Sequence, residues 1–219
     1  MLRVFIGVDK RQPVAYTVCR SSIERRAKKR VIIEPIKLEW TPITRCGLTE
    51  FTFARYAAPW LCGYEGISVF MDADVIVQDD INELAELAQE RCPVSVVKAP
   101  LRFEWPSVMV FRNYLCKSLT PEYINDPSTS PQKLSWSNPI GELPGEWNFC
   151  VGYDKPLQNY PKLIHYTQGI PCWPETQGCE YSEVWHEEHQ HANGSVSFQE
   201  LMGRSVHAQH VYKRLACAQ

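Results

Sequence analysis

The sequence predicts an open α/β domain in which helices cover a mostly parallel, twisted sheet. Three observations favour it. Short apolar segments rich in branched residues alternate with segments of amphipathic helical pattern over the first two thirds of the chain. The chain has 219 residues, of which 44% are hydrophobic, so one domain can bury a core. Neither a G-x-G-x-x-G segment after the first strand nor a G-x-x-x-x-G-K-[ST] segment occurs, which disfavours a dinucleotide fold and a P-loop.

The first half of this pattern is the clearest. Residues 2–8 form an apolar run that predicts a buried strand, and Asp9 stands at its carboxyl end. Pro13 begins a predicted helix that continues to about Ala27. A strand is expected at 31–38, and Thr49 is expected to cap a helix over 50–62.

Later elements are shorter and less regular. Further strands are expected around 69–77, 94–98, 107–111 and 163–164, and a further helix at 81–90. The segment 120–145 contains five prolines and is expected to be an irregular surface excursion. We therefore expect one main domain at 1–175 and a less regular, helical C-terminal extension at 176–219.

Composition excludes several classes of function. The net charge is −2 and the basic run at 25–30 fits a solvated helix end, so nucleic acid is not an expected partner. Nine cysteines without a C-x-x-C pair, in a chain with no evident signal peptide, indicate reduced thiols in a cytoplasmic protein. No apolar stretch has the length of a transmembrane helix.

The most informative segment is Asp72-Ala73-Asp74, which interrupts an apolar run. An unpaired buried carboxylate costs several kcal/mol, so the pair is expected to hold a divalent cation. Oxygen ligands suit Mg²⁺ or Mn²⁺, which commonly also bind substrate phosphates. The alternative is a turn in which both carboxylates cap exposed backbone groups. In an open sheet, Asp9 would lie at the same edge, where such sheets bind ligands.

One histidine can be interpreted either as a structural residue or as a ligand. His165 follows the apolar pair Leu163-Ile164 and precedes a turn at Gly169. Imidazole is an acceptable ligand for Mn²⁺. The alternative is a buried histidine with a purely structural hydrogen bond, which is the commoner situation for a lone histidine after a strand.

Four blocks of residues, in order, resemble those of glycosyltransferase family 8, the group with the GT-A (Rossmann-like) fold that contains glycogenin and bacterial lipopolysaccharide galactosyltransferases. They are residues 4–9 (VFIGVD), the stretch from 52–55 (TFAR) to 72–79 (DADVIVQD), residues 143–148 (LPGEWN), and His165-Tyr166 with Gly169 and Trp173. Together they cover about the first 175 residues, and the second block is the specific one.

The resemblance implies a metal-dependent glycosyltransferase, of hexosyltransferase type, that moves a sugar from a UDP-sugar to a glycan or another hydroxyl acceptor with retention of configuration. It implies Mn²⁺, or Mg²⁺, bound by Asp72, Asp74 and His165. Val8 and Asp9 would contact the uridine, and Arg55 the diphosphate-sugar. The implied nucleotide-sugar-binding residues are Val8, Asp9, Arg55, Asp72, Ala73, Asp74, His165 and Gly169.

The chain also departs from the family pattern. The C-terminal motif H-x-x-G-x-x-K-P-W is altered, because Gly169 comes one residue late and Pro171 or Cys172 stands where lysine is expected. Pro106-Ser107-Val108 replaces the Asn-x-Gly strand that faces the sugar, and the Asp-Gln pair near the anomeric carbon is not found. A GT-A domain that binds a nucleotide-sugar without turnover is therefore an alternative.

Two other enzyme classes fit less well. Asp72 and Asp74 could be the nucleophile and acid/base of a haloacid-dehalogenase-like phosphatase, but that motif normally lies on the first strand. Residues 186–191 (HEEHQH) suggest a zinc hydrolase, but Gln190 stands where H-E-x-x-H needs its second histidine. A solvated helix in the C-terminal extension is the preferred interpretation of that segment.

Overall fold

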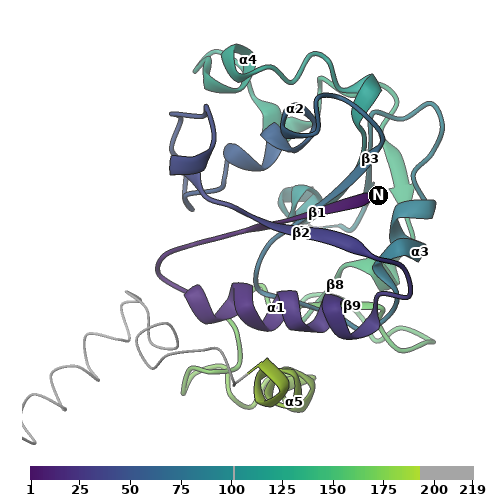
Figure 1. Cartoon of the computed structure of the whole chain (residues 1–219). Coiled ribbons are helices and arrows are strands. Elements are labelled where there is room, and N and C mark those ends of the chain that lie inside the picture. The colour runs from purple at the N-terminus through teal and green to yellow at the C-terminus, as the bar shows by residue number, and fades with distance from the viewer. Residues whose placement is uncertain (101, 193–219) are drawn as a thin grey trace, which may run out of the picture.

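The computed structural model describes residues 1–100 and 102–192 (Figure 1). The main sheet contains β2 (Val31–Ile36), β1 (Leu2–Gly7), β3 (Ile67–Met71), β6 (Val108–Arg112), β5 (Val94–Val97) and β7 (Gly141–Leu143), in that order. β6 is antiparallel to both of its neighbours, whereas the other pairs are parallel. The predicted mostly parallel α/β sheet is confirmed.

A second, small sheet contains β4 (Val75–Val77), β9 (Leu163–His165) and β8 (Phe149–Cys150), in that order. The α-helices are α1 (Pro13–Arg26), α2 (Ala58–Leu61), α3 (Ile81–Glu86), α4 (Pro121–Asn125) and α5 (Ser182–Ala192). Two 3₁₀ helices border the candidate site, η2 (Ala54–Ala57) and η3 (Arg102–Ser107). None of the helices described is long and apolar enough to cross a bilayer.

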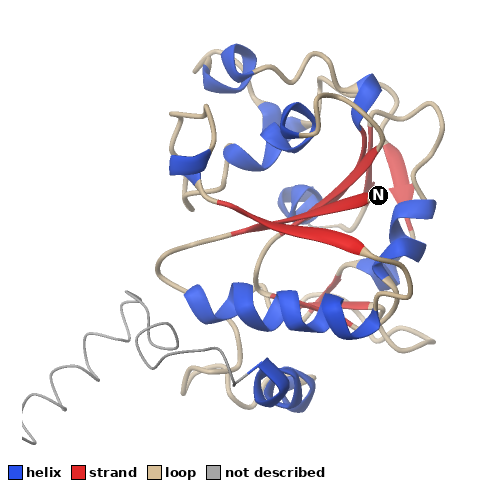
Figure 2. Ribbon diagram, in the orientation of Figure 1, coloured by secondary structure: helices blue, strands red, loops and turns tan. Residues whose placement is uncertain are grey.

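Both faces of the main sheet are covered. α1 and the small sheet lie against one face, and α2 and α4 lie over the other (Figure 2). Alternation along β1 explains this: Val4 and Ile6 belong to the cluster under α1, while Phe5 belongs to the cluster under α2. β2 is an edge strand, which is where a strand can contain a proline such as Pro35.

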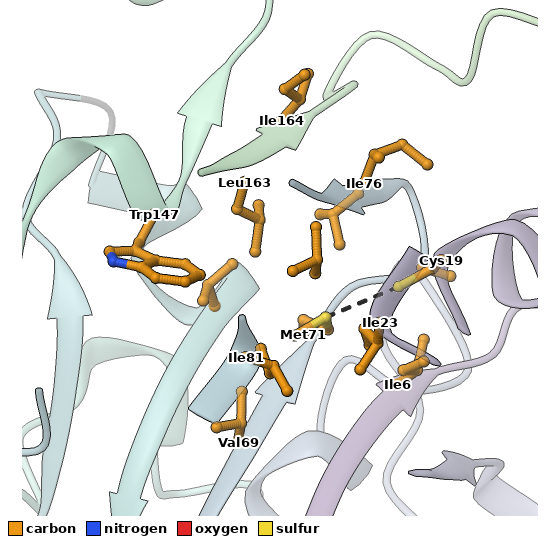
Figure 3. Close-up of a cluster of buried hydrophobic side chains, with 14 of the residues drawn as sticks. Ile6, Cys19, Ile23, Val69, Met71, Ile76, Ile81, Trp147, Leu163 and Ile164 are labelled. Atoms are coloured by element: carbon orange, nitrogen blue, oxygen red, sulfur yellow. Dashed lines mark hydrogen bonds between the residues drawn. The ribbon is translucent and has the colours of Figure 1, made fainter. Parts of the chain in front are cut away.

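The core under α1 fixes the end of the central strand β3. Met71, the last residue of β3, is fully buried, and its sulfur contacts the Cys19 thiol of α1 at 3.8 Å (Figure 3). Ile76 of β4 and Leu163 of β9 enter the same cluster. The segment that follows Met71 is therefore held from both sheets. All eight cysteines of the described residues are free.

The prediction of one α-helix over 50–62 is wrong, because the segment contains turns, a 3₁₀ helix and a short α-helix. Residues 50–53 form turns, η2 follows, and α2 is a single short turn of α-helix. Pro59 has no N–H with which to bond the Arg55 carbonyl, so a continuous α-helix cannot pass this point.

The segment 120–145 is more ordered than expected. Thr120 caps α4 by accepting a hydrogen bond from the Tyr123 N–H, and Pro121 occupies the first turn, where proline is favoured. Farther along, β7 adds an edge strand beside β5. The prolines of this segment therefore begin local elements instead of excluding them.

α5 is not the solvated helix that the sequence suggested. Glu188 is 1% exposed and accepts hydrogen bonds from Ser21 Oγ (2.7 Å), Arg25 Nη1 (2.9 Å) and Arg26 Nη1 (2.7 Å) of α1. Trp185 is buried as well, and the His189 ring stacks on it with centroids 5.1 Å apart. Glu188 of the HEEHQH segment and Arg25 and Arg26 of the basic run thus attach α5 to α1. The expected extension beyond residue 192 lies outside the described residues.

We predict that Glu188→Ala lowers the free energy of unfolding by about 2 kcal/mol, because the guanidinium groups of Arg25 and Arg26 lose the carboxylate that accepts their hydrogen bonds. Denaturant unfolding measures this. Glu187→Ala is the matched control, since the Glu187 side chain is 73% exposed on the same helix and should have little effect. Equal effects of the two substitutions would show that the contact with α1 contributes nothing.

Candidate functional site

Asp72-Ala73-Asp74 connects the main sheet to the small sheet. The Asp72 N–H donates to the Ser107 carbonyl (2.9 Å), and the Asp74 carbonyl accepts from the Tyr166 N–H (2.9 Å). The segment is thereby attached to the start of β6 on one side and to the end of β9 on the other. It is a connection between β3 and β4, not the end of one long strand.

The structure brings Asp72, Asp74 and His165 together. One potential ligand atom from each lies within 4.8 Å of the others. The pairing of β4 with β9 explains this, because Val75, the residue after Asp74, stands opposite His165 in the antiparallel register. Three ligands separated by up to 93 positions in sequence thus meet at one point.

Hydrogen bonds fix the orientation of the His165 ring. His165 is 2% exposed, and its Nδ1 lies 3.0 Å from Asn148 Oδ1. Asn148 Nδ2 donates to Ser107 Oγ at 3.0 Å, so the amide oxygen faces the ring and Nδ1 carries the proton. The other nitrogen, Nε2, then faces Asp74 Oδ1 at 3.3 Å. This is the arrangement in which a histidine offers Nε2 to a metal ion.

A second group of potential ligands lies on the other side of the ring. Cys150 Sγ and Glu104 Oε2 are each 3.9 Å from His165 Nδ1. Burial raises the pKa of the Cys150 thiol and of the Glu104 carboxyl. Because Nδ1 is already bonded to Asn148, this group is less suited to a cation than the two aspartates are.

Asp72 is the most electrostatically perturbed of the carboxylates. Burial raises its pKa to about 7, the nearby Arg55 charge opposes this, and Asp74 adds to it. Asp72 Oδ1 lies 3.0 Å from Arg55 Nη1 but is not aligned for a hydrogen bond, and it has no such partner among the described residues. This buried carboxylate oxygen therefore faces a positive charge but accepts no hydrogen bond from the described residues.

Arg55 is held rigidly. Its Nη1 donates to the Pro106 carbonyl at 2.8 Å, and its guanidinium lies over the rings of Phe51 (5.1 Å) and Phe70 (5.0 Å). With 8% exposure, it contacts Asp72 from the interior and does not line the adjoining hollow.

A hollow of about 520 Å³ opens beside Asp74, at the carboxyl ends of β1 and β3. Its lining consists of Asp9, Arg11, Gln12, Ala15, Leu48, Thr49, Phe51, Ala73, Asp74, Thr167, Gln168, Gly169 and Trp173. The predicted residues Asp9, Ala73, Asp74 and Gly169 therefore share one surface. Val8 is buried behind it, with its N–H bonded to the Ile36 carbonyl.

Two residues that border the site, Arg11 and Glu104, were not among the site residues predicted from the sequence. Arg11 forms an ion pair with Asp9, and Glu104 approaches His165 from η3. A signal existed only for Arg11, which is a cation two residues after Asp9 at the expected ligand-binding edge. Nothing local marks Glu104, because η3 reaches the site through the tertiary fold. Asn148, which lay in the LPGEWN block, gains its role only from the structure.

Solved glycosyltransferases share this fold. The bifunctional glycosyltransferase WbbM superposes with a TM-score of 0.69 at 17% identity, over 97% of this chain and 51% of that one. GlyE of Streptococcus pneumoniae gives 0.61 at 19% identity, over 97% and 63%. The galactosyltransferase LgtC, solved with donor and acceptor sugar analogues, gives 0.59 at 11% identity, over 90% and 98%. The chain spans about half the length of WbbM and most of LgtC.

Comparisons of sequence indicate less about function than comparisons of structure do. Protein CDI of Arabidopsis thaliana is 29% identical over 220 residues, which cover 84% of this chain and 84% of that protein. No protein-family model matches the chain. The comparisons therefore establish the GT-A glycosyltransferase fold, as the sequence resemblance implied.

We predict that binding of Mn²⁺, used as a probe, weakens as the pH falls below about 7. Asp72 has a pKa of about 7. Burial lowers the pKa of His165, but Asp74 outweighs burial, so the net pKa is well above the ordinary value. Both groups must lose protons to bind a cation, so binding should release protons. Calorimetry in buffers of different ionisation enthalpy measures this, and binding without proton release or pH dependence would contradict it.

We also predict that Asn148→Ala weakens Mn²⁺ binding by about tenfold or more, because the hydrogen bond that orients His165 is lost. Asn113→Ala is a matched control: Asn113 is equally buried and bonds Ser68 and the Glu65 carbonyl, away from the carboxylates. It should affect stability but not the Mn²⁺ affinity. If both variants bind Mn²⁺ equally well, Asn148 has no role in positioning the ligand.

Proposed function

We propose that this protein is a metal-dependent glycosyltransferase that uses a UDP-sugar donor. The observation that carries the proposal is the meeting of Asp72, Asp74 and His165 beside a hollow at the carboxyl ends of parallel strands. Open α/β sheets bind their ligands at this edge. The GT-A fold of the chain supports the assignment.

The residues fit a divalent ion. Asp72 Oδ1 is buried and has no hydrogen-bond partner among the described residues, and the Asn148 contact leaves His165 Nε2 as the ligand atom. Two carboxylates and one neutral imidazole suit Mn²⁺ better than Mg²⁺, which prefers oxygen alone. When bound, the ion would supply the positive charge that stabilises the departing diphosphate.

The side chains have separable roles in this proposal. Asp72, Asp74 and His165 hold the ion. Arg55 positions Asp72, since it contacts that carboxylate and not the hollow. Asp9 lies at the end of β1, where it can accept a hydrogen bond from a ribose hydroxyl, with Val8 behind it. Ala73 has only a methyl side chain and Gly169 has none, so the donor can approach the backbone closely at both positions.

The family resemblance implies retention of the anomeric configuration. In that mechanism a departing phosphate oxygen accepts the proton of the attacking hydroxyl, so no dedicated protein base is needed. The acceptor is proposed only as a hydroxyl of a glycan or another molecule. The proposal covers the domain spanning about 1–175, with the segment from 176 onwards as its extension.

We predict that Asp74→Asn weakens Mn²⁺-supported UDP binding by about tenfold or more, because one ligand of a small set loses its charge. Calorimetric titration of UDP with and without Mn²⁺ measures this. Asp79→Asn is a suitable control, since Asp79 pairs with Lys162 outside the hollow. UDP binding by Asp74→Asn with wild-type affinity and unchanged Mn²⁺ dependence would refute the assignment.

A test of donor turnover distinguishes a transferase from a domain that only binds a nucleotide-sugar. A thermal-shift screen of nucleotide-sugars with and without Mn²⁺ should identify a UDP-sugar that raises the unfolding temperature. Donor hydrolysis by the same protein would support the transferase. Binding without hydrolysis or transfer would instead indicate a nucleotide-sugar-binding module, and hydrolysis of an aryl phosphate would indicate the phosphatase alternative.

A further inference from the structure

The hollow poses an electrostatic problem for an anionic ligand. Its charged lining among the described residues consists of Asp9, Asp74 and Arg11, and a carboxylate oxygen of Asp72 lies within 4.8 Å of one of Asp74. A nucleoside diphosphate would bring at least two more negative charges into this carboxylate-rich surface. A divalent ion at Asp72 and Asp74 would offset these two carboxylates, and a cation of the protein that lines the hollow would then meet the charge of the diphosphate.

We propose that Arg11 is that cation and that it binds the donor diphosphate directly. This inference rests on the proposed function and identifies the protein residue that contacts the diphosphate. Arg11 is the basic residue among the described residues that line the hollow. Arg55 is buried against Asp72 and the Pro106 carbonyl, so its donors face the interior.

The contacts of Arg11 leave a donor for the ligand. Nε donates to Asp9 at 3.0 Å, and Nη2 donates to Asp9 and, at 3.0 Å, to the Leu48 carbonyl. Nη1 donates to no group among the described residues. Arginine has five N–H donors in a planar fork, so the guanidinium can keep both protein contacts and still bind a phosphate oxygen through Nη1.

Asp9 acts on Arg11 as a clamp. Besides the guanidinium contacts, its Oδ1 accepts a hydrogen bond from the Arg11 backbone N–H at 2.9 Å. The Leu48 contact joins the end of β1 to the opposite loop, so the guanidinium is fixed between two walls of the hollow. This preorganisation reduces the entropy lost when a diphosphate binds, although the Arg11 side chain is half exposed.

The test compares two adjacent cations of the same chain. Arg11→Met removes the proposed contact, and Lys10→Met is the matched control because Lys10 Nζ lies 3.1 Å from Glu39 and 3.8 Å from Glu50 and does not line the hollow. UDP affinity is measured by calorimetry in Mn²⁺, and uridine affinity by saturation-transfer NMR. Mn²⁺ affinity and the unfolding temperature check that each variant retains the fold and the cation site.

Arg11→Met should weaken UDP binding by about tenfold or more, as expected for loss of one charge-assisted hydrogen bond. Uridine, which has no phosphate, should bind it as it binds the wild type, and Lys10→Met should change UDP affinity less than about twofold. If Arg11→Met does not fold, Arg11→Gln is expected to give the same pattern.

The outcomes separate the two proposals. Unchanged UDP affinity in Arg11→Met, or equal losses for UDP and uridine, would overturn the Arg11 assignment and leave the transferase proposal intact. Absence of UDP binding by the wild-type protein at any Mn²⁺ concentration would instead overturn the proposed function itself.

Discussion

Asp72 places a carboxylate at the end of the central strand, where its side chain is 16% exposed, and the neighbouring structure is organised around this charge. An uncompensated buried carboxylate would cost several kcal/mol. Arg55 compensates it from the interior, and the Pro106 carbonyl and two phenylalanine rings keep Arg55 in place. The Asp72 N–H is bonded to the Ser107 carbonyl, so the backbone that carries the carboxylate is held beside the start of β6.

The small sheet completes the site that Asp72 begins. β4 continues directly from Asp74, and its pairing with β9 brings His165 opposite Val75. β8 pairs with β9 on the other side and follows Asn148, whose amide orients the imidazole. Each strand of the small sheet thus carries or directly follows one polar residue of the site, and the apolar side chains between the sheets hold these residues in register.

Sequence patterns predicted the features that depend on short segments. Apolar runs located β1, β3 and β9. Residue spacing identified Asp72 and Asp74 as candidate ligands and the family resemblance added His165, and the fold brings the three together. The short α2 follows from Pro59, a local signal that the helical pattern over 50–62 overrode. The remainder depended on contacts distant in sequence: the burial of Glu188 follows from the docking of α5 on α1, and the role of Asn148 from an amide orientation set by Ser107. The spacing of apolar residues along the chain does not indicate contacts of this kind.

The charge balance of the cluster links cation binding to nucleotide binding. Without a cation, the two carboxylates of Asp72 and Asp74 face two positive groups, Arg55 and a His165 whose raised pKa favours the imidazolium. A divalent ion adds two positive charges and would displace the His165 proton while Arg55 stays in place, so the cluster would become more positive. The surface beside the hollow would then attract a diphosphate that it otherwise does not favour. If the proposed function holds, cation binding would therefore favour the nucleotide binding that follows it.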